Sequence, residues 1–161
     1  MTNDDWTVVA AIGQAAAAAA AAVGLAFSGF QMKAATRVAD LQALQEFLRS
    51  VTEREALLCE ADTDERKARA FNEFLNFLEI NAAAVNHGLF PKASREQVVD
   101  KLCSSIAVLQ EASDWREALR QAVSSSTALL ELVEFMRREK KTIAERATEL
   151  RTAASKSNVL I

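Results

Sequence analysis

The feature that most constrains this chain is an uncharged segment near its N-terminus, from Trp6 to Met32. It is built around an unbroken alanine run, Ala15 to Ala22, with large apolar side chains on both sides of that run. As a helix rising about 1.5 Å per residue, the segment is roughly 40 Å long, which exceeds the roughly 30 Å hydrocarbon core of a bilayer. We therefore expect a single-pass transmembrane helix. Its insertion is only marginally favourable, because alanine contributes little and Gln14 opposes it.

Two other interpretations of this segment stay open. A cleaved signal peptide requires a basic stretch before a short apolar core, whereas here Asp4 and Asp5 come first and no break follows the apolar residues. The soluble alternative is an alanine-rich helix packed in an oligomer, since alanine is the best helix former and lets helices approach closely.

The charges that flank the segment predict its orientation. Lys33, Arg37 and Arg49 follow it, and no Lys or Arg precedes it. By the positive-inside rule, the N-terminus then lies outside and the C-terminal part lies in the cytoplasm. Cys59 and Cys103 would be in a reducing compartment, so we expect small buried thiols rather than a disulfide.

Small residues recur at every fourth position of the segment and mark a face for contact with another helix. They are Gly13, Ala17 and Ala21 in one row, and Ala20, Gly24 and Ser28 in another. Such faces allow the close backbone approach that drives helix association in lipid. The expected partners are therefore the lipid bilayer and another transmembrane helix, from a second copy or from a different subunit.

A stalk helix is expected over residues 33–61, because no Gly or Pro interrupts the chain just after residues 1–32, which comprise the N-terminal tip and the transmembrane helix. Apolar residues spaced by three and four form a stripe along it: Leu41, Leu44, Leu48, Val51 and Leu58. Fewer than three clean heptads are present. The stripe therefore favours the packed face of a bundle helix over a free coiled coil, which remains the alternative.

Apolar periodicity over residues 62–141 predicts a small bundle of about four helices that packs on the stalk. Its first helix begins with a capping box at Asp62 and Glu65 and ends at His87-Gly88, where glycine supplies a left-handed C-cap. The apolar face of this helix is expected to form the centre of the core. It consists of Phe71, Phe74, Leu75, Leu78, Ala82 and Val85, continued by Leu89 and Phe90.

Further helices are expected after Pro91. Ser94 and Gln97 form a second capping box, and the helix that they open either restarts near Ser113 or runs on to Val123. Its apolar residues are Val98, Val99, Leu102, Cys103, Ile106 and Leu109. A turn at residues 124–127 precedes a helix with Leu129, Leu130, Val133 and Met136 on its apolar face. Residues 142–161 are expected to form a charged tail, as a solvated helix end or in contact with an anionic membrane surface.

Residue patterns that carry chemistry are missing, so we expect no enzyme, no metal and no cofactor. The single histidine, His87, has no Cys or carboxylate at ligand spacing, and the four glycines do not form a phosphate-binding loop. The formal net charge is −3, and no part of the chain is strongly basic. This excludes the electrostatic footprint of a nucleic-acid-binding protein, and no small-molecule substrate is indicated.

The segment Asn76–Phe90, NFLEINAAAVNHGLF, resembles part of a group of uncharacterised bacterial proteins whose domain has no known function. These proteins have one N-terminal transmembrane helix, a Leu/Gln-rich stalk and a helical cytoplasmic domain. The resemblance covers roughly Val8 to Lys141 and implies an all-helical protein anchored in the bacterial inner membrane. The later helices of this chain have fewer aromatic residues than that group, and no functional residue is carried over.

Together these features predict an all-α, non-enzymatic, membrane-anchored protein that acts as a homo-oligomer or as an accessory subunit of an inner-membrane complex. One alternative is a membrane-disrupting or pore-forming effector in which Gln14 faces the lumen. The other is a soluble helical oligomeric scaffold.

Overall fold

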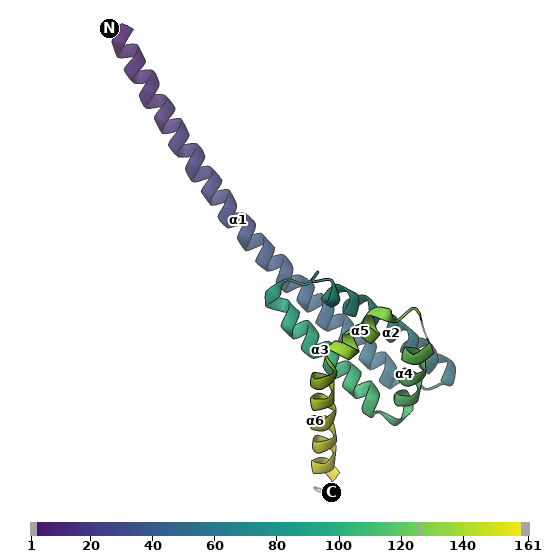
Figure 1. Cartoon of the computed structure of the whole chain (residues 1–161). Coiled ribbons are helices and arrows are strands. Elements are labelled where there is room, and N and C mark those ends of the chain that lie inside the picture. The colour runs from purple at the N-terminus through teal and green to yellow at the C-terminus, as the bar shows by residue number, and fades with distance from the viewer. Residues whose placement is uncertain (1–2, 126, 159–161) are drawn as a thin grey trace. The chain divides into compact units, whose positions relative to one another are not determined.

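The computed structural model describes residues 3–125 and 127–158, with side chains at Gln14, 21–124 and 127–156. Within these residues all regular structure is helical, which confirms the predicted all-α class (Figure 1). The helices are α1 (Asn3–Glu60), α2 (Asp64–Asn86), α3 (Lys92–Glu111), α4 (Ser113–Ser125), α5 (Leu130–Arg138) and α6 (Lys140–Asn158). Four of them, α2 to α5, lie within residues 62–141, where about four were expected, and α6 occupies most of the predicted tail.

The chain divides into two compact units, residues 1–42 and 43–161. The long helix α1 belongs to both, because it passes residue 42 without a break and ends at Glu60. The first unit consists of α1 alone in its described part. From residue 21 to 39, every side chain there is exposed to solvent.

The core of the second unit takes buried side chains from all six helices. The six residues predicted for the apolar face of α2 are all buried, which confirms that face. In α3 the predicted residues are buried as well, except Val99, which is half-buried. Helix α6 adds Ile143 and Ala147 to the core, although the sequence places both in a charged tail.

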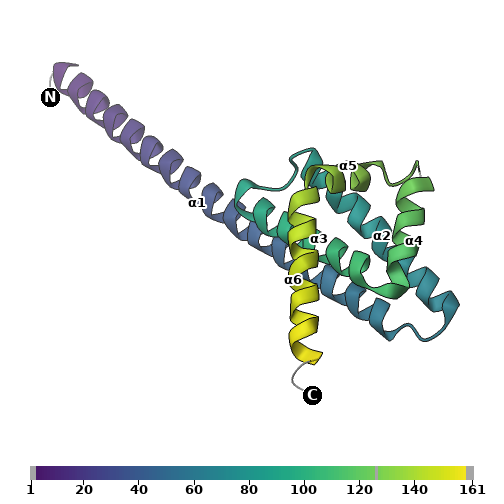
Figure 2. The ribbon, with the colours of Figure 1, turned by 60° about the horizontal axis from the view of Figure 1, so that its bottom comes forward.

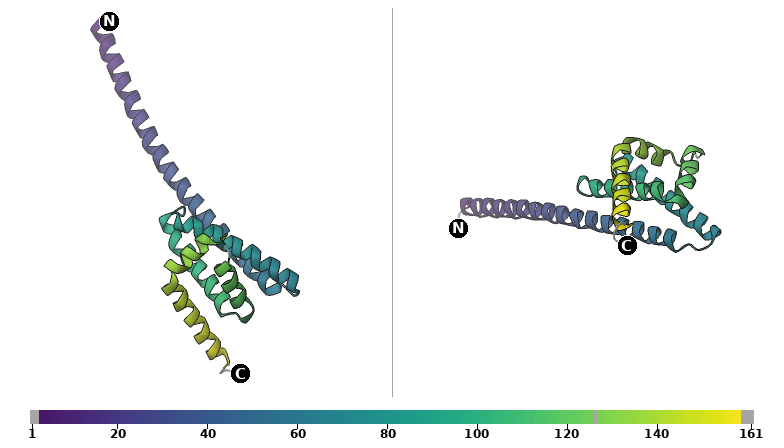
Figure 3. Two further views of the ribbon diagram at one scale, coloured as in Figure 1. Left: turned by 45° about the vertical axis from the view of Figure 1, so that its right-hand side comes forward. Right: turned by 90° about the horizontal axis from the view of Figure 1, so that it is seen from below.

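Helix α3 lies at the centre of the second unit and contacts α2, α4 and α6, while α5 packs on α2 and α6. Helices α4 and α6 lie on different sides of α3 (Figures 2 and 3). Aromatic rings join further helices: Phe47 of α1 lies 5.9 Å from Phe77, between ring centroids. Phe71 of α2 stacks on Trp115 of α4 at 5.4 Å. These contacts hold together segments that are far apart in the sequence.

The ends of α2 are close to the predicted ones. Its N-cap is Thr63, one residue after the expected Asp62, and the Thr63 hydroxyl accepts the N–H of Arg66 at 3.3 Å. At the other end Gly88 has φ of 69°, which confirms the left-handed cap. Of the two residues expected to continue the apolar face beyond this cap, Leu89 is exposed and Phe90 packs against the core.

The predicted start of α3 is wrong. The helix begins at Lys92 with Pro91 as its N-cap, so Ser94 lies inside the first turn instead of capping it. The Ser94 hydroxyl donates to the carbonyl of Pro91 at 3.2 Å, which satisfies this buried group locally. At its C-terminus α3 ends at Glu111, because Ala112 is extended, and α4 begins at Ser113. Of the two alternatives, the structure therefore contains the helix that restarts near Ser113, and not one continuous helix to Val123.

The predicted apolar face of α5 is also wrong in part. Leu129 is buried as expected, but Leu130 is 65% exposed, and the buried residues of the helix are Leu132 and Phe135. The helix has nine residues, and two turns do not define one face by periodicity alone. Its rotation is fixed instead by contacts with α2, described below.

Candidate functional site

Large apolar side chains are exposed along the described part of α1 that precedes the bundle. Val23, Leu25, Phe27, Phe30 and Met32 are each between 62% and 75% exposed. Since successive helical residues are rotated by about 100°, Leu25 and Met32 lie on the side opposite Val23, Phe27 and Phe30. Large apolar side chains therefore lie on two opposite sides of this segment, and Gly24, Ser28 and Gln31 lie together on a side between them.

The small residues predicted to contact another helix lie only partly in the region where side chains are described. Ala21, Gly24 and Ser28 are exposed on α1, and a Cβ added to Gly24 would meet no atom within 4 Å. The Ser28 hydroxyl donates to the carbonyl of Gly24 at 2.9 Å. The side chains at positions 13, 17 and 20 (Gly13, Ala17 and Ala20) lie outside the described residues, and Gln14 is exposed.

In the part of the chain that the structure describes, no helix has both the length and the apolar character required to cross a bilayer.

The stripe predicted along the stalk is divided between two environments. Leu44, Val51 and Leu58 are buried in the bundle, whereas Leu41 and Leu48 are exposed. Phe47, which the predicted stripe omits, is buried and packs near Phe77 and Phe90. Its spacing of three from Leu44 and four from Val51 is the signal that identifies it as part of the packed face.

A polar contact fixes α1 against α3 beside this packed face. The ammonium group of Lys101 lies 2.9 and 2.8 Å from the two carboxylate oxygens of Glu55. The buried hydroxyl of Ser105 donates to the same carboxylate at 2.7 Å. Only about a third of the Glu55 and Lys101 side chains is exposed, at 31% and 29%, so the pair is shielded from bulk water. Glu55 thus interrupts the apolar stripe and sets the position of α1 on α3.

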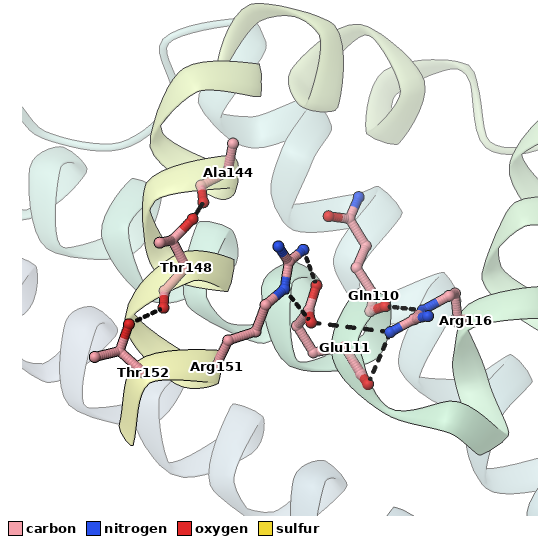
Figure 4. Close-up of polar contacts among 7 residues, drawn as sticks. All are labelled: Gln110, Glu111, Arg116, Ala144, Thr148, Arg151 and Thr152. Carbon is pink, nitrogen blue, oxygen red and sulfur yellow. Dashed lines mark hydrogen bonds and ion pairs between the residues drawn. The ribbon is translucent and has the colours of Figure 1, made fainter. Parts of the chain in front are cut away.

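A second polar cluster joins α3, α4 and α6 around the carboxylate of Glu111 (Figure 4). Arg151 of α6 donates to both of its oxygens, at 2.6 and 2.7 Å. Arg116 of α4 donates to the carbonyls of Gln110 and Glu111 at the end of α3 and lies 3.8 Å from the Glu111 carboxylate. The hydrogen bond from Arg151 holds the pKa of Glu111 below its usual value, and partial burial opposes this effect.

A third cluster joins α2 to α5. The carboxylate of Glu79 accepts the backbone N–H groups of Glu131 and Leu132, at 3.0 and 2.6 Å. Asn86 donates to the Glu131 carboxylate at 2.8 Å, and His87 lies 3.1 Å from it. The Asn86 hydrogen bond is the main cause of the lowered pKa of Glu131. These contacts place the first turn of α5 on α2.

The two cysteines differ in exposure. Cys59 is exposed near the end of α1, and Cys103 is buried in α3, where burial raises the pKa of its thiol to about 12. Both thiols are free, and Cys59 differs from the buried thiol that the sequence predicts. Among the residues that the structure describes, no group of three or more potential metal-ligating side chains occurs.

Comparison with known proteins identifies no relative: no family model, no curated protein and no solved structure matches this chain. The arrangement of the residues themselves is therefore the basis for a functional proposal.

Proposed function

We propose that this chain is a membrane-anchored helical interaction protein, with the N-terminal part of α1 in the bilayer and residues 43–161 as its cytoplasmic domain. The observation that carries the proposal is the exposure of large apolar side chains on two opposite sides of α1 over residues 23–32. A helix with large apolar side chains on opposite sides buries both only where it is surrounded, as in lipid or in the core of a large assembly. A single partner helix would cover one side and leave the other in water.

The sequence on either side of this region supports the same placement. The uncharged segment begins after Asp5 and extends to Met32, so residues preceding the described side chains add to its length. Lys33 and Arg37 follow the apolar segment directly. Basic residues at this boundary favour the cytoplasmic side for the bundle, which is the inner face of the cell membrane in a bacterium.

The proposed mode of action is binding rather than catalysis, through association in the membrane. Gly24 and Ser28 lie one turn apart with open space beside Gly24, which leaves room for the backbone of a second helix. The partner is another transmembrane helix, from a second copy of this chain or from a larger membrane complex. Homo-oligomerisation is the version that can be tested with this chain alone.

Fractionation of cells that express the full chain tests the membrane anchor. We expect the chain in the membrane pellet, resistant to alkaline extraction and released by detergent. Replacing Leu25 and Phe27 by Lys should move it to the soluble fraction, because each charge in a membrane span costs about 2.5–3.5 kcal/mol. Leu89→Lys, at an exposed apolar residue of the bundle, is the matched control and should leave the chain in the pellet. A soluble oligomer obtained without detergent would overturn the proposal in favour of a soluble scaffold.

Orientation and association need separate measurements. A membrane-impermeant maleimide should label the exposed Cys59 only after the cells are broken, and labelling of intact spheroplasts would contradict the proposed orientation. Crosslinking in membranes should decrease when Gly24 and Ser28 are replaced by Leu. Ala35→Leu, which lies beyond the apolar segment, is the control for a general effect of added bulk. Unchanged crosslinking in the Gly24/Ser28 variant would argue against self-association through this face.

A further inference from the structure

A cavity of about 530 Å³ lies next to the Glu111 cluster, between residues of α3, α4, α5 and α6. Three arginines line it: Arg116 and Arg120 from α4, and Arg151 from α6. The apolar side chains of Leu119, Val123 and Met136 line it as well. Its volume is in the range of pockets that bind small molecules. We call it the arginine cavity.

The charges around the arginine cavity do not balance. Arg151 and Arg116 share the carboxylate of Glu111, and Arg120 forms its ion pair with Glu117, at 2.8 Å. Three guanidinium groups are thus paired with two carboxylates. One positive charge is left over among these contacts, so a ligand with one negative charge would complete the set.

The arginines also keep hydrogen-bond donors available. In each of them the side-chain hydrogen bonds use Nε and one terminal nitrogen, Nη2. Within the described residues, the Nη1 group of each arginine makes no hydrogen bond. A guanidinium group binds a carboxylate through two parallel N–H groups, and Nη1 supplies further donors for such a contact.

We propose that the arginine cavity binds a small amphiphilic carboxylate of the fatty-acid class. Its carboxylate contacts the guanidinium groups of Arg120 and Arg116, and its aliphatic chain packs against Leu119, Val123 and Met136. The charge that is left over selects a monoanion, and the apolar lining selects an aliphatic chain over a purely polar ion. Ligand binding in this cavity would connect α4 to α5 and α6.

Methionine NMR provides a direct test, because the chain has three methionines and, of the two that the structure describes, Met136 lines the cavity and Met32 does not. The full chain is labelled with ¹³C-methyl methionine. It is studied in buffer or in zwitterionic detergent, whichever keeps it monodisperse, and hexanoate is added as the probe. We expect a saturable shift of the Met136 signal. The Met32 signal should not shift with added hexanoate. Partitioning of hexanoate into detergent would shift the Met32 signal as well, so the comparison distinguishes partitioning from binding. Acetate, which lacks the chain, and hexylammonium, which has the opposite charge, should produce no saturable shift.

A pair of arginine variants makes the test specific. Arg120→Gln should weaken hexanoate binding about ten-fold, as expected for a lost charge-assisted hydrogen bond. Arg137→Gln removes a similarly exposed arginine that also forms an ion pair with a glutamate three residues away, outside the cavity, and should leave the affinity unchanged. The Met136 signal without ligand shows whether each variant is folded.

Any of three results with hexanoate and acetate would overturn the proposal. They are a Met136 shift that does not saturate, equal shifts with acetate and hexanoate, or an unchanged affinity in Arg120→Gln. Tighter binding of N-acetylleucinate than of hexanoate would also overturn it, since the site would then fit the C-terminus of a peptide better than an acyl chain.

Discussion

The carboxylate of Glu79 in α2 accepts the backbone N–H of Leu132 in α5 at 2.6 Å. Its other oxygen accepts the neighbouring N–H of Glu131. The N-cap residue of α5 itself is Leu129, which makes no side-chain capping hydrogen bond. The cap that a helix normally obtains from its own sequence is therefore supplied here by a different helix.

Replacing Glu79 by Ala should lower the free energy of unfolding by about 1–2 kcal/mol, because two N–H groups at the start of α5 lose their acceptor. Urea denaturation followed by circular dichroism measures this change. Glu73→Ala in the same helix is the control. Glu73 forms only an exposed ion pair with Arg69, so its loss should change stability by less than about 0.5 kcal/mol. Equal effects of the two substitutions would contradict the capping role.

Two leucines of α5 provide a matched comparison of burial. Leu132 is fully buried and Leu130 is 65% exposed. Leu132→Ala should destabilise the chain by about 2–5 kcal/mol, since it leaves a cavity in the core. Leu130→Ala should remain within about 0.5 kcal/mol of the unmodified chain. Both changes are measured by urea denaturation. A larger effect at Leu130 would mean that the helix has the rotation predicted from the sequence and not the one described.

The shielded ion pair between Glu55 and Lys101 predicts non-additive effects. Glu55→Leu alone should cost about 1–3 kcal/mol, because the ammonium group of Lys101 and the hydroxyl of Ser105 lose their acceptor. The double variant Glu55→Leu/Lys101→Met should recover part of this loss. A thermodynamic cycle of the two single variants and the double variant measures the coupling. A coupling energy of zero would show that the two side chains act independently.

The lowered pKa of Glu111 predicts sensitivity to acid. A carboxyl group with a lower pKa in the folded chain stabilises it at pH values above the unfolded pKa, for which the ordinary value is 4.5. This stabilisation decreases as the pH falls below that value and the carboxylate is protonated. Thermal melting at pH 7 and pH 3.5 should therefore show a smaller loss of Tm for Glu111→Gln than for the unmodified chain. An identical loss would mean that Glu111 does not contribute.

The sequence predicts best those helices that are long and have a clear apolar period. In α2 the six residues from Phe71 to Val85 repeat over several turns, so one face is defined and the structure buries it. The end of this helix is equally well predicted, because Gly88 adopts a backbone conformation that other residues rarely adopt. Local patterns suffice in both cases.

Prediction fails where the deciding contact comes from another part of the chain. The rotation of α5 depends on Glu79, and nothing within residues 129–138 indicates this. Likewise, the Glu111 cluster depends on Arg151, forty residues away in sequence. Charges of this kind resemble ordinary surface charges until the fold brings them together, so the sequence does not identify the arginine cavity.

The stacking of Trp115 on Phe71 gives the second unit its own optical signal. The chain has two tryptophans and no tyrosine, and the other tryptophan, Trp6, belongs to the first unit. Trp6→Phe therefore leaves fluorescence emission that reports on the packing of α4 against α2. Trp115→Phe leaves emission from the N-terminal segment alone. Two single-residue changes thus turn one chain into two separate spectroscopic reporters, one for each unit.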